Sequence, residues 1–458
     1  MNIDPLQIPR RSAHLGWVLL WALSACGPQP LAQADSQRPP GLAAPLITAS
    51  PVPVTDDPID NSTDNTTADN TTADNTATDS VPRPADHPAL VPNPDLSPTT
   101  RPSPTPPLPK ATQALLNQLP QAPLNPPPAD FRFAVISDLN RAYGSTTYDP
   151  SVTTTVNLLP YWRPDLVLCS GDMVAGQSLS LSDDEVTAMW TAFDQLVAEP
   201  LRSAGIPFGF TLGNHDASAA PNGAGGYSFQ RDRDQAAAYW QTPAHDPGVN
   251  FVDRSQFPFY YSFTAGPADE VFFLVWDGST HIIPPAQLAW VDQALQSSPA
   301  QQAQFRFLIG HLPLYAVAEG RNRPGEVMAN SEQLRTLLER HQVHTYISGH
   351  HHAYYPGQRG QLDLLHTGLI GSGPRPLIDQ STPSPKTLTL LDLDTSQGQL
   401  TYTTYNAETW EVIALETLPR FLLGHNGRVR RRDVAPSDLT APEQSRCEAR
   451  LGAALCRD

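Results

Sequence analysis

The chain has 458 residues, of which 49 are prolines, and a formal net charge of -17 at pH 7. This length accommodates one large folded domain or two ordinary ones. The excess of acidic groups argues against a surface that follows the phosphates of nucleic acid, and it gives no general attraction for anionic ligands.

The first 26 residues predict an export signal. Arg10 and Arg11 supply a positive start, and Leu15–Leu23 supplies an apolar stretch that is too short to cross a bilayer core of about 30 Å as a helix. The stretch ends in Leu-Ser-Ala-Cys, which resembles a bacterial lipobox, where the cysteine is lipidated. We therefore expect an exported protein that Cys26 anchors on the extracytoplasmic side of a bacterial membrane. An ordinary signal peptide that contains a cysteine is the alternative.

Residues 27–129 are rich in Pro, Ser, Thr, Asn, Asp and Ala and contain a five-residue repeat, Asp64–Ala68 and then Asp69–Ala73. Such a composition buries too little apolar surface to offset the entropy lost when the backbone is ordered. We predict a disordered linker here, stiffer over the proline-rich section Pro102–Pro128.

The folded domain is expected over residues 130–420, where apolar runs of strand length alternate with amphipathic stretches. The clearest helix starts at a capping box formed by Ser182 and Glu185, and further helices are expected at 285–296 and 331–340. Strands that alternate with helices predict an α/β fold with a largely buried sheet. The strand-like runs are Phe133–Ile136, Leu166–Cys169, Ile206–Leu212, Val271–Trp276, Phe305–Ile309, Val343–Ile347, Leu364–Ile370 and a hairpin at 387–405.

Residues 421–458 are predicted to be a C-terminal tail. Cys447 and Cys456 lie close together in it and are expected to form a disulfide in an oxidising compartment. The basic run Arg428–Arg432 is expected to be solvated. Cys169 lies inside an apolar run and is expected to be a buried thiol.

Polar residues with metal-binding chemistry end five of the strand-like runs. Because ligands of open α/β sheets bind beyond the carboxyl ends of the strands, these residues are expected to converge on one metal site. Carboxylate, amide and imidazole ligands without cysteine suit Mn, Fe, Zn or Ni and argue against a structural zinc site. The motifs are Asp138-Leu139-Asn140, Gly171-Asp172, Gly213-Asn214-His215-Asp216, Gly310-His311 and Gly349-His350-His351-His352.

This ordered set resembles the calcineurin-like metallophosphoesterase superfamily, whose pattern runs Asp-x-His, Gly-Asp, Gly-Asn-His-Asp/Glu, Gly-His and Gly-His-x-His. The resemblance covers residues 131–375 and implies a four-layer α/β/β/α sandwich with two divalent ions at the carboxyl ends of the strands. The ions activate water for attack on phosphorus. It further implies that His215 acts beside the scissile phosphate and that Asp216 orients its ring. The first ion would be held by Asp138, Asn140, Asp172 and His352, and the second by Asp172, Asn214, His311 and His350.

Asn140 departs from the pattern, which has a histidine there. An amide oxygen is a weaker donor than an imidazole nitrogen, so the first ion is expected to be held loosely or to be a harder ion such as Mn or Mg. Segments 310–315 and 349–354 resemble the purple acid phosphatases most. Ala175 stands where those proteins have the tyrosine that colours their iron, so a purple site is not expected.

Together, the export signal and the resemblance imply an exported, metal-dependent enzyme that hydrolyses small phosphate monoesters. A phosphodiesterase or nucleotidase on the same scaffold is one alternative, because specificity resides in loops such as 175–181 and 316–330. A catalytically weak surface protein that binds a ligand is another alternative, and Asn140 is the feature that favours it.

Overall fold

The computed structural model describes residues 107–457. The predicted export signal, the predicted lipid-acceptor Cys26 and the linker as far as residue 106 lie outside the described residues. Among residues 107–457, no helix is both long enough and apolar enough to cross a membrane.

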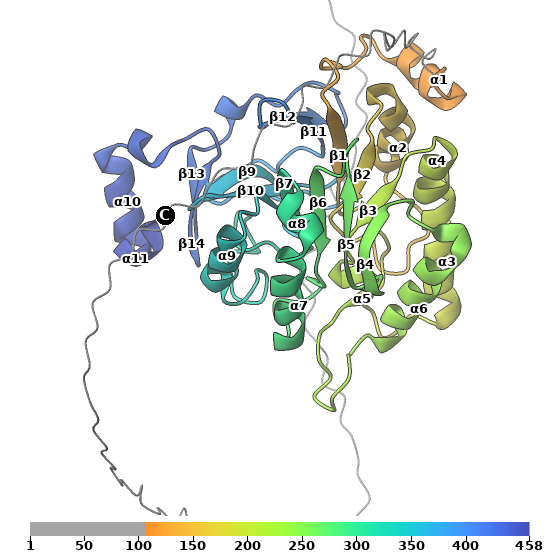
Figure 1. Ribbon diagram of the computed structural model, residues 1–458, viewed down its shortest axis with the longest axis horizontal. Coiled ribbons are helices and arrows are strands. Elements are labelled where there is room, and N and C mark those ends of the chain that lie inside the picture. The colour runs from red at the N-terminus through yellow and green to blue at the C-terminus, as the bar shows by residue number, and fades with distance from the viewer. Residues whose placement is uncertain (1–106, 458) are drawn as a thin grey trace, which may run out of the picture. The chain divides into compact units, whose positions relative to one another are not determined.

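Two β-sheets lie at the centre of this region and pack face to face (Figure 1). In the first sheet β1, β2 and β3 are parallel, and in the second β6, β7, β8 and β10 are parallel. The first sheet has the order β12 (Gln399–Asn406), β11 (Thr387–Asp394), β1 (Phe131–Ile136), β2 (Leu166–Cys169) and β3 (Phe208–Phe210). The second has the order β13 (Phe421–Gly424), β14 (Gly427–Arg431), β9 (Tyr354–Arg359), β10 (Leu362–Thr367), β8 (Thr345–Ser348), β7 (Phe305–Ile309), β6 (Val271–Val275), β5 (Tyr260–Ala265) and β4 (Asn250–Gln256).

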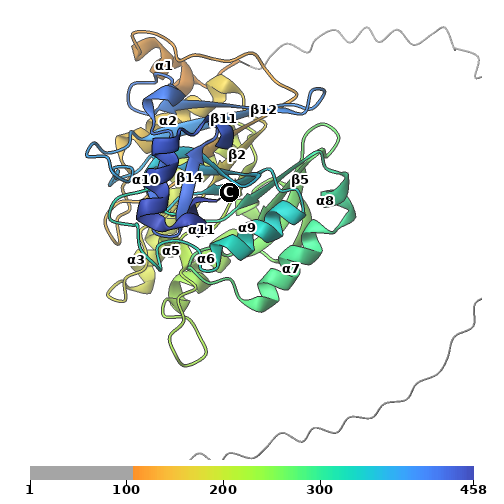
Figure 2. The same cartoon turned by 90° about the vertical axis from the view of Figure 1, so that its left-hand side faces the viewer.

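Helices cover the outer faces of both sheets, so the layers run α/β/β/α, as the family resemblance implies (Figures 1 and 2). Helices α2, α3, α4 and α6 cover the first sheet, and α7, α8 and α9 cover the second. In the described residues the α-helices and one π-helical turn are α1 (Lys110–Gln118), α2 (Pro150–Trp162), α3 (Asp183–Phe193), the π-helical turn (Asp194–Ala198), α4 (Glu199–Ser203), α5 (Asn214–Ala217), α6 (Gln230–Gln241), α7 (Pro285–Leu295), α8 (Ser298–Gln302), α9 (Ser331–Arg340), α10 (Ala441–Leu451) and α11 (Ala453–Cys456). Short 3-10 helices lie at Pro243–His245, Leu415–Thr417 and Pro436–Asp438.

Alternate residues of the second sheet belong to two different cores, because side chains of a strand point to opposite faces. Phe273 of β6 and Phe307 of β7 face the first sheet, where their rings lie 5.4 and 5.1 Å from that of Phe133. Phe272 and Leu274 belong to the other core, beneath α7 and α9. The apolar runs are therefore continuous because both faces of this sheet are buried.

The predicted linker extends too far, because residues 107–129 form α1 and an ordered, extended segment that packs on α2. Proline removes a backbone donor but keeps its carbonyl acceptor, so side chains of the domain are able to hold such a segment. Trp162 Nε1 donates to the carbonyl oxygen of Leu124 at 2.9 Å, and Arg132 Nη2 donates to that of Pro126 at 3.0 Å. The folded region therefore begins before Phe131.

The predicted C-terminal tail is wrong as a separate segment, because β13 and β14 extend the second sheet. Arg430 of β14 lies opposite Gln358 of β9 and is only 1% exposed, so the basic run predicted to be solvated is a buried strand. Its charge is accommodated by hydrogen bonds, including one to Gln358 Oε1 at 3.2 Å. Cys447 and Cys456 form the expected disulfide between α10 and α11, and Cys169 is buried.

Candidate metal centre

The carboxyl ends of five strands, three from the first sheet and two from the second, bring the candidate ligands together. Asp138 and Asn140 follow β1, Asp172 follows β2, and Asn214 begins α5 directly after β3. The histidines follow the second sheet, His311 after β7, and His350 and His352 after β8.

A first group of ligand atoms consists of Asp138, Asp172 and His352, one atom of each lying within 4.8 Å of the others. His352 Nε2 lies 3.2 Å from Asp138 Oδ1, while its Nδ1 lies 2.9 Å from the carbonyl oxygen of Gly373. A carbonyl only accepts, so Nδ1 carries the proton and Nε2 offers its lone pair to the site. Asn140 donates its Nδ2 to the carbonyl oxygen of Val174 at 3.3 Å, which leaves Oδ1 as its available donor atom for a cation.

A second group surrounds the amide oxygen of Asn214, which lies 3.0 Å from His311 Nε2 and 2.9 Å from His350 Nδ1. The amide is oriented by Gln177, whose Oε1 accepts from Asn214 Nδ2 at 2.6 Å. His311 Nε2 also lies 3.4 Å from Asp172 Oδ1, so Asp172 belongs to both groups. Carboxylate, amide and imidazole atoms at these distances have the ligand chemistry of a site for a divalent cation.

The buried carboxylates also require positive charge nearby, because an unpaired buried anion is costly. Burial would raise the pKa of Asp138 and of Asp172, but His352 beside the first and His311 beside the second hold both below the usual value. Burial would lower the pKa of His311, yet Asp172 raises it to about 9. A proton on His311 therefore occupies the position that a metal ion would take on binding.

Glu326, in the loop between β7 and α9, lies behind His350 and was not predicted from the sequence. Its Oε2 lies 3.0 Å from His350 Nε2, which forms the carboxylate–histidine pair that orients a metal-binding imidazole. The hydrogen bond from His350, with the nearby Arg323 and Arg321, holds the pKa of Glu326 well below its usual value. Burial and the charge of Arg321 lower the pKa of His350 to about 3, so the ring is neutral, as a metal ligand must be.

The backbone holds four ligands in the left-handed region. The φ angles of Asp138, Asp172, His350 and His352 are 50°, 56°, 63° and 54°. Such conformations are uncommon outside glycine and cluster at functional sites. Neighbouring glycines are needed for close approach: a Cβ on Gly213 would lie 2.1 Å from Asp172 Oδ1.

His215 lies beside the two ligand groups, but Asp216 does not orient its ring as predicted. His215 Nδ1 lies 3.2 Å from the carbonyl oxygen of Gly176, and Nε2 lies 3.9 Å from Asp172 Oδ2. Asp216 instead accepts the backbone amides of Val174 and Gly213, both at 2.8 Å. The reason is its place in the first turn of α5, from which the carboxylate reaches back to the start of the helix. Burial and the charge of Asp172 raise the pKa of Asp216 to about 7.

His351, between two ligands, has a structural contact of its own. Its Nδ1 accepts from the backbone amide of Val317 at 3.3 Å, so Nε2 donates to the carbonyl oxygen of Glu326 at 3.0 Å. This ring therefore fixes the loop that carries Glu326.

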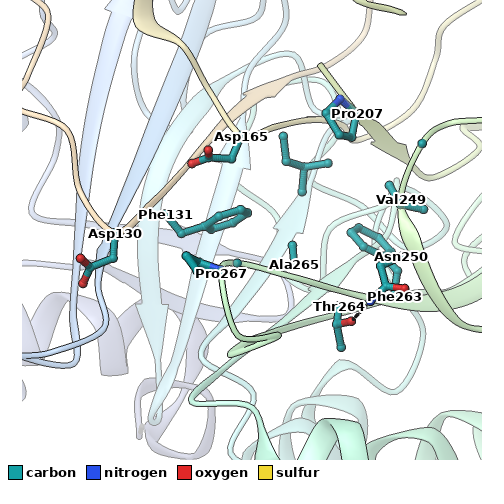
Figure 3. Close-up of a pocket in the computed structure, with 13 residues that line it drawn as sticks. Asp130, Phe131, Asp165, Pro207, Val249, Asn250, Phe263, Thr264, Ala265 and Pro267 are labelled. Atoms are coloured by element: carbon teal, nitrogen blue, oxygen red, sulfur yellow. Dashed lines mark hydrogen bonds between the residues drawn. The ribbon is translucent and has the colours of Figure 1, made fainter. Parts of the chain in front are cut away.

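A cavity of about 360 Å³ lies at the opposite end of the strands (Figure 3). Its lining includes Phe131 and Leu166, which begin β1 and β2, and Phe263 of β5. Since the candidate ligands follow the strand ends, this cavity is remote from the metal centre.

Of the comparisons with known proteins, the match to a family model agrees with this arrangement. The family model of calcineurin-like phosphoesterases matches residues 131–354. Among solved structures, the chain is similar to purple acid phosphatase PPD1 from yellow lupin, Lupinus luteus, at 16% identity and a TM-score of 0.45, over 62% of this chain and 52% of that chain. It is also similar to GAP50, the anchor in the inner membrane complex of Plasmodium, at 16% identity and a TM-score of 0.37, over 72% of this chain and 96% of that chain. A third is Yfce, a phosphoesterase from E. coli, at 12% identity and a TM-score of 0.29, over 62% of this chain and 97% of that chain. The search of curated proteins found no match.

Proposed function

Residues 131–354 belong to the calcineurin-like phosphoesterase family of metal-dependent hydrolases, and from this premise we propose that the protein is an exported phosphomonoesterase anchored to a bacterial membrane through Cys26. The observation that supports the catalytic part is the pair of ligand groups that share Asp172. Export and anchoring are supported by the apolar stretch Leu15–Leu23 and the lipobox that follows it.

The residues present fit two divalent ions, as the family's dinuclear site requires. Asp138, Asp172, His352 and Asn140 would hold one, and Asp172, Asn214, His311 and His350 the other. When bound, such ions lower the pKa of water and offset the charge of phosphoryl oxygens. The mixed carboxylate, amide and imidazole set favours Mn, Fe, Zn or Ni, with Mn favoured beside Asn140.

His215 is placed to handle the proton of the leaving group. The carbonyl oxygen of Gly176 accepts from Nδ1, which fixes the plane of the ring and leaves Nε2 turned towards Asp172 and the ligand groups. In its protonated form the ring donates from Nε2 to the departing ester oxygen, the role of a general acid.

The test combines metal analysis with hydrolysis of para-nitrophenyl phosphate and its bis-ester in the presence of Mn, Fe, Zn or Ni. We expect two ions per chain and metal-dependent turnover that favours the monoester. Preference for the bis-ester would support the phosphodiesterase alternative instead. No turnover with any metal would overturn the proposal and favour a binding protein.

Anchoring is tested separately by the position of the protein in fractionated bacteria. We expect the wild-type protein in the membrane fraction. Cys26→Ser should appear in the soluble fraction or as a longer precursor that keeps its signal. An unchanged distribution would overturn the lipid anchor.

A further inference from the structure

Two arginines beside the metal centre carry donors that no described residue satisfies. The Nε atoms of Arg321 and Arg375 are buried and make no hydrogen bond within residues 107–457. A buried donor without an acceptor is unfavourable. The pair therefore indicates a ligand that supplies the missing acceptor.

Both arginines flank the ligand histidines of the β8 loop. Arg321 Nη1 lies 2.7 Å from His350 Nε2 and 3.3 Å from His350 Nδ1, the nitrogen turned towards Asn214. The backbone amide of Arg375 donates to the carbonyl oxygen of His352 at 3.0 Å. The Arg375 side chain reaches the segment that carries Arg321. A Cβ added to Gly320, the residue before Arg321, would lie 3.1 Å from Arg375 Nη1.

The charges at this place are unbalanced in favour of cations. The carboxylate that pairs with the cations here is that of Glu326, and its two oxygens are shared among His350, Arg321 and Arg323. Arg375 makes no ion pair among the described residues. In a chain of net charge -17, this local excess of positive charge favours an anion.

We propose that Arg321 and Arg375 form a binding wall for a phosphoryl oxygen and thereby select phosphate monoesters over diesters. This inference rests on the proposed phosphoesterase function. A monoester is a dianion with three terminal oxygens, and guanidinium groups match phosphate oxygens in charge and geometry. A diester replaces one of those oxygens with an uncharged organic group. Placed against two partly buried guanidinium groups, that group would leave their donors unsatisfied.

The test compares Arg375→Ala and Arg375→Lys with the wild-type protein on para-nitrophenyl phosphate and its bis-ester. Arg375→Ala should lower kcat/KM for the monoester by about 10-fold or more, the worth of one charge-assisted hydrogen bond, and for the bis-ester by less than about 3-fold. Arg375→Lys, which keeps the charge but loses the planar fork, should be intermediate. Arg340→Ala is the matched control, because this side chain lies on the surface of α9 and is 63% exposed.

Binding of inorganic phosphate gives a second readout that does not require turnover. Phosphate should raise the Tm of the wild-type protein, because a ligand that binds only the folded state stabilises it, and Arg375→Ala and Arg321→Ala should both lose this shift. An equal loss for both esters, or a phosphate shift that survives in both variants, would overturn the proposed wall. A wild-type protein that hydrolyses neither ester but shows an arginine-dependent phosphate shift would contradict the enzyme while supporting the wall.

Discussion

Replacing Glu326 by Gln should loosen the binding of a metal ion at His350 without unfolding the protein. The Glu326 carboxylate faces His350 Nε2 at 3.0 Å and is ionised at neutral pH, because the hydrogen bond from His350 and the nearby arginines depress its pKa. Glutamine keeps a neutral oxygen acceptor of the same shape. The hydrogen bond therefore persists, but the negative charge behind the imidazole is lost.

The magnitude follows from the contacts of this carboxylate. Loss of an outer partner of a metal-binding histidine weakens metal binding by about 10- to 100-fold, or roughly 1.4 to 2.7 kcal/mol. We expect the lower end of this range, because Glu326 is 17% exposed and Arg321 and Arg323 already offset part of its charge.

The assay is competition for Zn or Mn against a chromophoric chelator, with circular dichroism to check the fold. Arg323→Ala is the control, because Arg323 pairs with the other oxygen of Glu326 at 2.7 Å but is 69% exposed. Such a surface pair contributes about 0 to 1 kcal/mol, so metal affinity should change little. Metal affinity that is unchanged in Glu326→Gln, or lowered equally in both variants, would refute the role of the carboxylate.

Three further outcomes are expected. His215→Ala should keep metal and fold but lower kcat by about 100-fold or more, and an undiminished kcat would remove the proton-donor role. A chain that starts at residue 130 should have a lower Tm than one that starts at 107, because Trp162 and Arg132 lose their acceptors. Equal Tm values would show that this segment does not stabilise the domain. Burial would raise the pKa of Glu332, but Arg359 holds it below its ordinary value of 4.5. Its stabilisation is therefore complete above that pH and is lost as the pH falls through the lower folded-state pKa. The Tm difference between wild type and Glu332→Gln should thus shrink as the pH falls below 4.5, and a difference that stays constant on acidification would contradict this account.

Elements with a strong local pattern were predictable from the sequence. Helix α9 (Ser331–Arg340) and strand β7 (Phe305–Ile309) have the predicted bounds, because their apolar spacing alone specifies a buried face. Helix α6 was not predicted, since Asp232 and Arg233 make it look solvated. Both are buried, and Arg233 is paired with Asp277 from the loop after β6. Pairing between distant charges leaves no local pattern.

The same distinction applies to the metal centre. Residues that directly follow strands, such as Asp138 and His311, were predictable because strand ends converge in this class of fold. The residues that orient these ligands were not predictable. Glu326, Gln177 and the carbonyl oxygen of Gly176 lie in loops whose paths depend on the packing of the whole domain.

The division of the ligands between two sheets has a consequence for the resistance of the protein to proteolysis. An ion held by Asn214, after β3, and by His311, after β7, would join the sheets at one end, while Phe133 and Phe307 hold them together by contact alone. Removing the ion would leave that end closed only by hydrogen bonds, and local opening there would cost less free energy. In surroundings poor in metal, we therefore expect proteolytic lifetime to shorten as well as activity to fall, so metal supply would control the abundance of the protein as well as its rate.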